Sequence, residues 1–165
     1  GADRMALDSL FRINPAAADE IAEAVGRQAV IRVQPLVKVG NDICVYDHLI
    51  RGPVGKIDVS ELLGDNSSFS ELMVVDVENE GALNSFSISL LDPFSDYNVQ
   101  LICFGGITFH TQIKNLFSKA NVSAVAIGNS LSYREIPHKR LVTQTEVDFA
   151  RTTSFGTATS GAREW

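Results

Sequence analysis

The chain has 165 residues, of which 45% are hydrophobic and 21% are charged, a mix typical of one soluble globular domain with a real core. Its formal net charge of −6 argues against a general nucleic-acid or anionic-membrane binder, although backbone amides can still form a local anion site. No apolar run approaches the roughly 18–20 residues of a membrane span. We therefore expect a cytoplasmic protein with neither nucleic acid nor membrane as a partner.

The cysteines and histidines do not indicate a metal site or a cofactor. Cys44 and Cys103 are far apart in the chain, and Cys103 lies inside an apolar run. The three histidines lack metal-ligand spacing with one another or with a cysteine. The sequence therefore predicts two buried, reduced thiols, no metal and no cofactor.

The first half of the chain alternates apolar runs with residues that begin or end secondary structure. Asn14 can cap a helix whose first position suits Pro15, and Gly26 should stop that helix. Pro35 should end the strand that directly precedes it in the chain. Asp58 is a second candidate cap, for a later helix. The expected elements are a strand at residues 4–8, a helix at 16–25, a strand at 29–34, a hairpin within 37–47 and a helix at 59–64.

The second half continues the alternation, which predicts a parallel α/β sheet with five strand units. We assign one domain to residues 1–150 and a mobile Ser/Thr/Gly-rich tail to residues 151–165. The expected elements are a buried strand at 71–77, a loop at 78–85, a short helix at 88–94, a strand at 99–104, a helix at 109–120, a strand at 122–127 and a helix at 133–142.

Glycine-bearing turns follow the last two expected strands. Residues 99–104 run into Gly105 and Gly106, and residues 122–127 run into Gly128, Asn129 and Ser130. Glycine allows close backbone approach and positive φ, and free N–H groups in such turns attract phosphate. Two such turns on one side of a sheet are the layout of the phosphate site in a (βα)8 barrel. The alternatives are a plain tight turn at the first pair and a helix cap at the second.

Several stretches carry a family resemblance in their order and spacing. GADRMALDS at the start resembles the pattern "GADKVxxN[ST]", and ELMVVDVENEG (71–81) resembles "EILLTSIDRDG". ICFGG (102–106) resembles "IASGG", and AVAIGNSLSYREI (124–136) resembles "AALAASIFHFREI". Over about residues 1–140 the chain thus resembles the cyclase subunit of imidazole glycerol phosphate synthase, a (βα)8 barrel of histidine biosynthesis. The match covers strands four to eight, which implies a partial barrel over residues 1–150.

The resemblance implies an activity, a partner and a set of site residues. Members of the family use ammonia from a glutaminase partner to close an imidazole ring on a ribulose-linked precursor that carries two phosphates. Glu80 falls on a catalytic acid of the family, with a solvated loop carboxylate as the alternative. The residues that fall on the two phosphate sites are Gly81, Gly105, Gly106, Gly128, Asn129 and Ser130 at one side, and Asp8 and Ser9 at the other. For Asp8 and Ser9 the alternative is a simple helix lead-in.

The chain departs from the family where ring closure needs a second carboxylate. The family has an aspartate at the end of its fifth strand, where this chain has Val33, Gln34 and Pro35. Ring closure needs an acid and a base on opposite faces of the substrate. Two alternatives to the ring-closing enzyme therefore remain. One is a relative that amidates a sugar acid in O-antigen or surface-polysaccharide biosynthesis, which the segments EGALNSF and AVAIGNSLSYRE resemble more closely. The other is a catalytically impaired glutaminase-binding partner.

The resemblance begins at the family's fourth strand. A closed barrel leaves no sheet edge, whereas five units alone expose one. The sequence is therefore either a fragment of a longer reading frame, which could be non-functional, or a chain that pairs with another. If it folds as given, we expect a homo-oligomer that buries the exposed edge.

Overall fold

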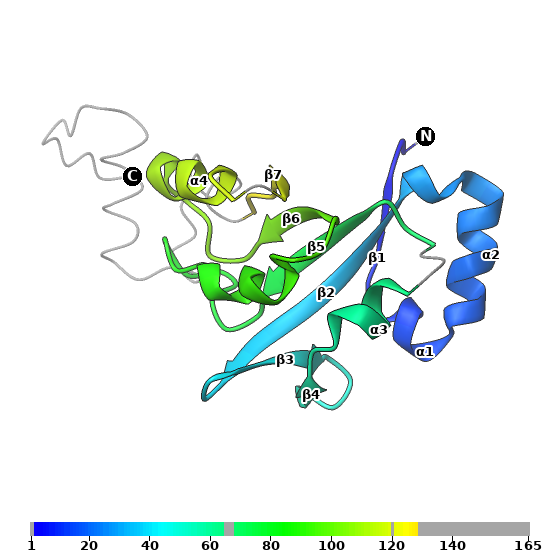
Figure 1. The fold of residues 1–165 in the computed structure, drawn as a ribbon, viewed down its shortest axis with the longest axis horizontal. Coiled ribbons are helices and arrows are strands. Elements are labelled where there is room, and N and C mark those ends of the chain that lie inside the picture. Colours follow the sequence, from blue (N-terminus) through cyan, green and yellow to red (C-terminus); the bar gives the residue numbers. More distant parts are fainter. Residues whose placement is uncertain (1, 65–67, 120, 129–165) are drawn as a thin grey trace, which may run out of the picture. The chain divides into compact units, whose positions relative to one another are not determined.

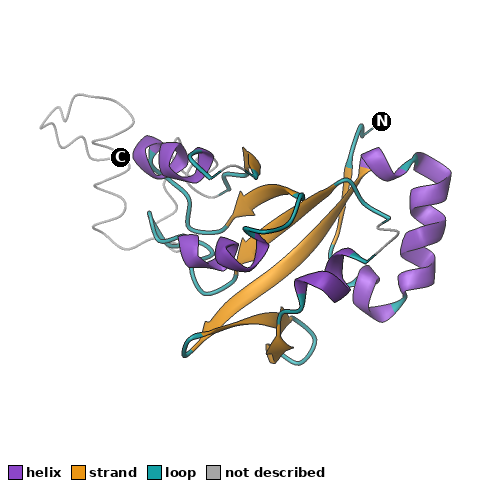
Figure 2. Ribbon diagram, viewed as in Figure 1, coloured by secondary structure: helices purple, strands orange, loops and turns teal. Residues whose placement is uncertain are grey.

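The computed structural model describes residues 2–64, 68–119 and 121–128, and nearly all of them belong to one compact unit that ends at Ala126. This unit is a mixed α/β structure built on a seven-stranded, mostly parallel sheet (Figures 1 and 2). Its elements in chain order are β1 (Met5–Leu7), α1 (Leu10–Ile13), α2 (Pro15–Val25), η1 (Arg27–Ala29), β2 (Val30–Val39), β3 (Asp42–Asp47), β4 (Gly52–Lys56), α3 (Val59–Leu63), β5 (Glu71–Asp76), η2 (Ile88–Phe94), β6 (Gln100–Phe104), α4 (His110–Phe117) and β7 (Val122–Val125).

The parallel part of the sheet follows chain order. β1, β2, β5, β6 and β7 pair in that sequence, and every pairing among them is parallel. The hairpin of β3 and β4 is attached antiparallel to the second half of β2, on the same side as β1. Figure 1 shows β2 as the long diagonal strand, which pairs with β1, β3 and β5. The sheet is not closed, since no pairing joins β7 to β1 or β4 within the described residues.

The core lies over the middle strands. Leu72, Val74, Leu101 and Cys103 on β5 and β6 are fully buried, and Phe94 on η2 is buried with them. In Figure 2 the helices α1, α2 and α3 lie on the right, beside β1 and β2, while η2 and α4 lie on the left. β5 and β6 carry the continuous apolar runs 72–75 and 101–104, which are typical of strands covered on both faces. None of the helices described is long and apolar enough to cross a membrane.

The prediction that Pro35 ends its strand is wrong, because β2 runs through it to Val39. The carbonyls of Val30 and Leu36 accept hydrogen bonds from Ser70 and Val77 on the β5 side. Since successive residues of a strand present their backbone groups to opposite sides, Pro35 faces away from β5. On that other side β1 pairs only as far as residue 32, and β3 pairs only from residue 36. The missing N–H therefore falls where no neighbouring strand needs a donor.

Other sequence expectations are confirmed. The side chain of Asn14 accepts the backbone N–H of Ala17 at the start of α2, and the side chain of Asp58 accepts that of Glu61 at the start of α3. The hairpin and the five strand units are present, whereas α1 and β4 were not predicted. The expected helix at 133–142 and the expected tail at 151–165 lie outside the described residues.

Candidate functional site

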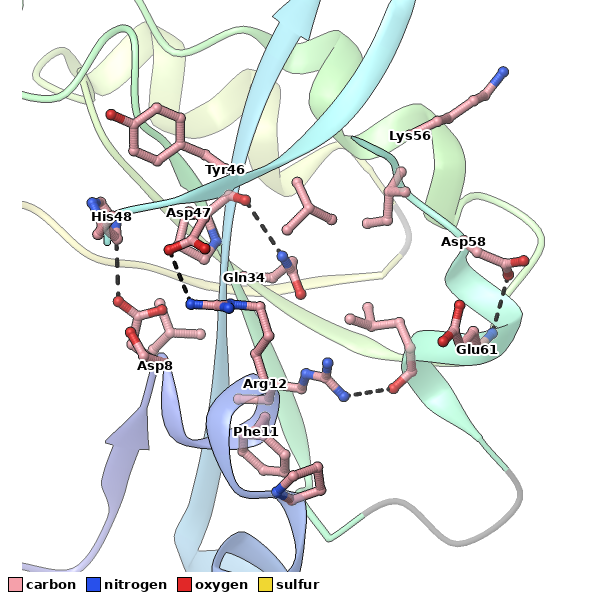
Figure 3. Close-up of a pocket in the computed structure, with 18 residues that line it drawn as sticks. Asp8, Phe11, Arg12, Gln34, Tyr46, Asp47, His48, Lys56, Asp58 and Glu61 are labelled. Atoms are coloured by element: carbon pink, nitrogen blue, oxygen red, sulfur yellow. Dashed lines mark hydrogen bonds and ion pairs between the residues drawn. The ribbon is translucent and has the colours of Figure 1, made fainter. Parts of the chain in front are cut away.

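A pocket of about 490 Å³ lies where β1 ends against β2, below the hairpin and beside α1 and α3 (Figure 3). This volume falls in the usual range for small-molecule sites. Asp8 and Ser9 form the wall that follows β1, and Gln34 comes from the middle of β2. Tyr46 comes from β3, and Glu61 from α3. The segment after β1 and the elements β2, β3 and α3 therefore all supply polar side chains to one hollow.

The expected ligand residues Asp8 and Ser9 both line this pocket. The Asp8 carboxylate faces His48, with 3.9 Å between Oδ2 and Nε2 (Figure 3). The His48 ring also packs edge-on against Tyr46, with 5.1 Å between ring centroids. The Ser9 carbonyl accepts the backbone N–H groups of Arg12 and Ile13, so this segment also leads into α1. The phosphate role of Asp8 and Ser9 stays a prediction.

A part-buried ion pair holds α1 to the end of β3 at the pocket wall. Arg12 donates from Nη2 to Oδ1 of Asp47 over 2.9 Å, and Asp47 is only 5% exposed (Figure 3). The same carboxylate oxygen accepts the backbone N–H of Leu49 over 2.8 Å. The charge of the half-exposed Arg12 therefore balances the buried carboxylate of Asp47.

Arg32, from β2, is a part-buried cation of a different kind. Its guanidinium stacks over the ring of Phe11 at 4.9 Å and that of Phe69 at 5.7 Å. Nη1 donates to the carbonyl oxygen of Leu62 in α3 over 2.9 Å. Burial lowers the pKa of Arg32 from its usual value, and the negative charge of Glu61 opposes that shift. No carboxylate of the described residues lies within ion-pair distance of Arg32.

Gln34 stands where the cyclase family has an aspartate, and it is 5% exposed. Its Nε2 donates to the carbonyl oxygen of Pro35 over 3.4 Å, a long contact. No hydrogen bond within the described part of the chain involves its Oε1. Buried side-chain amides are usually satisfied, so this oxygen is available to a ligand in the pocket.

The predicted catalytic acid Glu80 does not reach the pocket. Glu80 and Gly81 are exposed in the loop after β5, and neither lines the hollow. The carboxylate that organises this loop is Asp76, which is 1% exposed. It accepts the backbone N–H of Ser87 over 2.7 Å and the side-chain amide of Asn79 over 2.8 Å. Asp76 therefore has a structural role in this loop.

The predicted phosphate glycines Gly105 and Gly106 are buried, have positive φ and lie outside the pocket lining. A Cβ on Gly105 would lie 2.5 Å from the carbonyl oxygen of Asp76, and one on Gly106 would lie 2.7 Å from that of Asn79. The carbonyl of Gly106 accepts the backbone N–H of Ser85. Close packing of the end of β6 against the loop after β5 accounts for both glycines, which supports the tight-turn alternative.

Two further expectations concern the end of the described chain and metal ions. Gly128 is described, but Asn129 and Ser130, which complete its predicted phosphate turn, lie outside the described residues. Within residues 2–64, 68–119 and 121–128 no cluster of histidine, cysteine or acidic side chains could hold a metal ion. Burial raises the pKa of the Cys103 thiol to about 12, which makes it a poor nucleophile.

No protein-family model matches the chain. The polar pocket-lining residues that the sequence did not single out are Arg12, Asp47 and above all Arg32. Arg32 and Gln34 alternate with Ile31, Val33 and Pro35 in the otherwise apolar run of residues 30–37. Polar residues at every second position of such a strand put two polar side chains on one face, and this signal could have found the pocket.

Proposed function

We propose that the chain is a cyclase-like (βα) barrel subunit that binds a small, phosphorylated metabolite and works with a glutaminase partner. The observation that supports this most is the strand order β1, β2, β5, β6, β7. Each parallel strand pairs with the next one along the chain, as in a barrel, and no reversal of order occurs as in a doubly wound sheet. In this proposal the five strands correspond to strands four to eight of the cyclase barrel.

The position of the pocket supports the same proposal. In barrel enzymes the ligand binds at the carboxyl ends of the strands. β1 ends at Leu7, directly before Asp8 and Ser9, and Gln34 lies just beyond the last residue of β2 that pairs with β1. Here the side chains of Ser9 and Tyr46 would bind ligand oxygens, and the Asp8 and His48 pair could move a proton.

A second function is favoured by the residues at the middle of β2. Cyclase ring closure uses a carboxylate at this point, and the chain has a buried amide, Gln34, with Arg32 two residues before it. An amide and a cation suit the binding of a carboxylate ligand better than they suit proton transfer. This favours the relative that amidates a sugar acid with glutaminase-derived ammonia over the ring-closing enzyme.

A calorimetric titration with the ribulose-linked bisphosphate precursor tests the first function. We expect micromolar binding and a raised melting temperature, because a ligand that binds only the folded state stabilises it. A Ser9→Asp variant should lose binding by charge repulsion, whereas Ser95→Asp, on an exposed site outside the pocket lining, should retain it. No heat of binding to the unaltered chain would refute the cyclase-type function.

A further inference from the structure

Among the described residues, one of the arginines and lysines that line the pocket, Arg32, has no carboxylate as an ion-pair partner. Arg12 is paired with Asp47, and Lys56 donates to Asp42 over 2.8 Å. Arg32 has no carboxylate within ion-pair distance among the described residues. A part-buried cation without a counter-ion is costly, and a bound anion would remove that cost.

Arg32 is also held in place before any ligand arrives. Two aromatic rings that contact each other edge-on, those of Phe11 and Phe69, lie 4.9 and 5.7 Å from its guanidinium carbon, and one of its donors is fixed on the Leu62 carbonyl. Arginine has five N–H donors in a rigid fork, so most of them remain free for a ligand. A fixed fork loses little side-chain freedom when it binds a planar anion.

Gln34 adds a second group to the same subsite. Arg32 and Gln34 are two residues apart on β2, so their side chains leave the strand on one face, and both line the pocket. Gln34 has a free Oε1 and one free N–H on Nε2, as its other contact is the long one to Pro35. It can therefore accept a ligand hydroxyl and donate to a ligand oxygen.

We propose that Arg32 and Gln34 form a subsite for the carboxylate of a small polar molecule such as a sugar acid. The inference rests on the proposed function, in which this pocket is the ligand site, and it names the substrate class. The arginine fork matches the two oxygens of a carboxylate. A phosphate dianion fits less well, because Asp58 and Glu61 line the same end of the pocket and neither forms an ion pair there.

Three probes with one sugar ring and different head groups test the subsite: glucuronate, glucose and glucose 6-phosphate. Each is titrated at equal millimolar concentrations into the ¹⁵N-labelled full chain, and the Arg32 Nε–H and Gln34 side-chain amide signals are followed. We expect glucuronate to shift both signals and to bind at least about tenfold more tightly than either other probe.

Variants decide whether Arg32 and Gln34 are responsible. Arg32→Gln should weaken glucuronate binding roughly tenfold or more, and Gln34→Glu should abolish it by placing a competing carboxylate beside Arg32. The matched control is Arg27→Gln, an exposed arginine outside the pocket lining, which should bind as the unaltered chain does. If Arg32→Gln fails to fold, Arg32→Lys keeps the charge without the fork and should still lose most of the affinity.

Three results would overturn the inference: no shift with glucuronate, glucuronate binding that survives Arg32→Gln or Arg32→Lys, or glucose 6-phosphate binding at least as tightly as glucuronate. Failure of the bisphosphate titration is a separate result. If the bisphosphate does not bind and glucuronate does, the cyclase-type function fails and the carboxylate subsite stands.

Discussion

Replacement of Gly105 by alanine tests whether this glycine serves packing. The φ of Gly105 is +105°, which an L side chain rarely adopts, and a Cβ there would lie 2.5 Å from the Asp76 carbonyl oxygen. Positive φ costs a non-glycine residue about 1–2 kcal/mol, and overpacking costs about 1–3 kcal/mol more. We therefore expect Gly105→Ala to lower the free energy of unfolding by ~2–5 kcal/mol.

Gly40 offers a matched control for the backbone contribution alone. It also has positive φ, +61°, but a Cβ there would meet nothing within 4 Å. Gly40→Ala should cost only the conformational part, about 1 kcal/mol. Because the added methyl group of Gly105→Ala points at the end of β5 and Gly105 lies outside the pocket lining, ligand affinity of the folded variant should not change.

The assay is urea denaturation followed by circular dichroism. The dependence of the free energy of unfolding on urea concentration must be equal for the unaltered chain, Gly105→Ala and Gly40→Ala. Equal losses for Gly105→Ala and Gly40→Ala would refute the close-packing explanation. Loss of ligand binding in folded Gly105→Ala, with little loss of stability, would instead return this turn to the phosphate role that its sequence suggested.

The environments of Arg12 and Cys103 lead to two further predictions. Arg12→Ala leaves the buried Asp47 carboxylate without its cation and should lower the free energy of unfolding, measured by urea denaturation, by about 1–3 kcal/mol. This is less than the full value for a buried pair, because the Arg12 side chain is 44% exposed. Lys56→Ala removes an exposed pair and should change nothing measurable, so equal effects of the two variants would contradict this reasoning. In a Cys44→Ser variant, Cys103 should react with a thiol reagent about a thousandfold more slowly when the chain is folded than in urea, because burial raises its pKa from 9.0 to about 12. The free energy of unfolding should also fall as pH rises from 9 toward 12, because the unfolded chain loses the thiol proton first. Fast reaction of the folded variant would show that the thiol is not buried.

The sequence predicted the elements whose ends are set by local chemistry. Asn14 and Asp58 satisfy backbone N–H groups within three residues of themselves, so their caps depend on nothing distant. Pro35 misled the prediction because its tolerance depends on which neighbouring strand it faces, and that is set by pairing with β1 and β3. β4 has the sequence GPVGK, whose glycines and proline disfavour a strand, and only the hairpin with β3 forms it.

The candidate site was predictable only where it follows directly from a strand end. Asp8 and Ser9 come immediately after β1, and they line the pocket. Arg12 and Asp47 are 35 residues apart and meet only because α1 and β3 pack together. Glu80 is exposed whereas Asp76 is buried, and this contrast depends on the path of the loop after β5, which local sequence does not determine.

The proposed function requires the pocket at the ends of β1 and β2 to bind a phosphorylated ligand of the cyclase type. The most direct test is a titration of the ¹⁵N-labelled chain with the ribulose-linked bisphosphate precursor, in which the shifted backbone signals are mapped onto the structure. The account predicts saturable shifts at Asp8, Ser9 and their pocket neighbours, with none at Glu80. Shifts confined to Gly105 and Gly106, or no saturable shift at all, would contradict it.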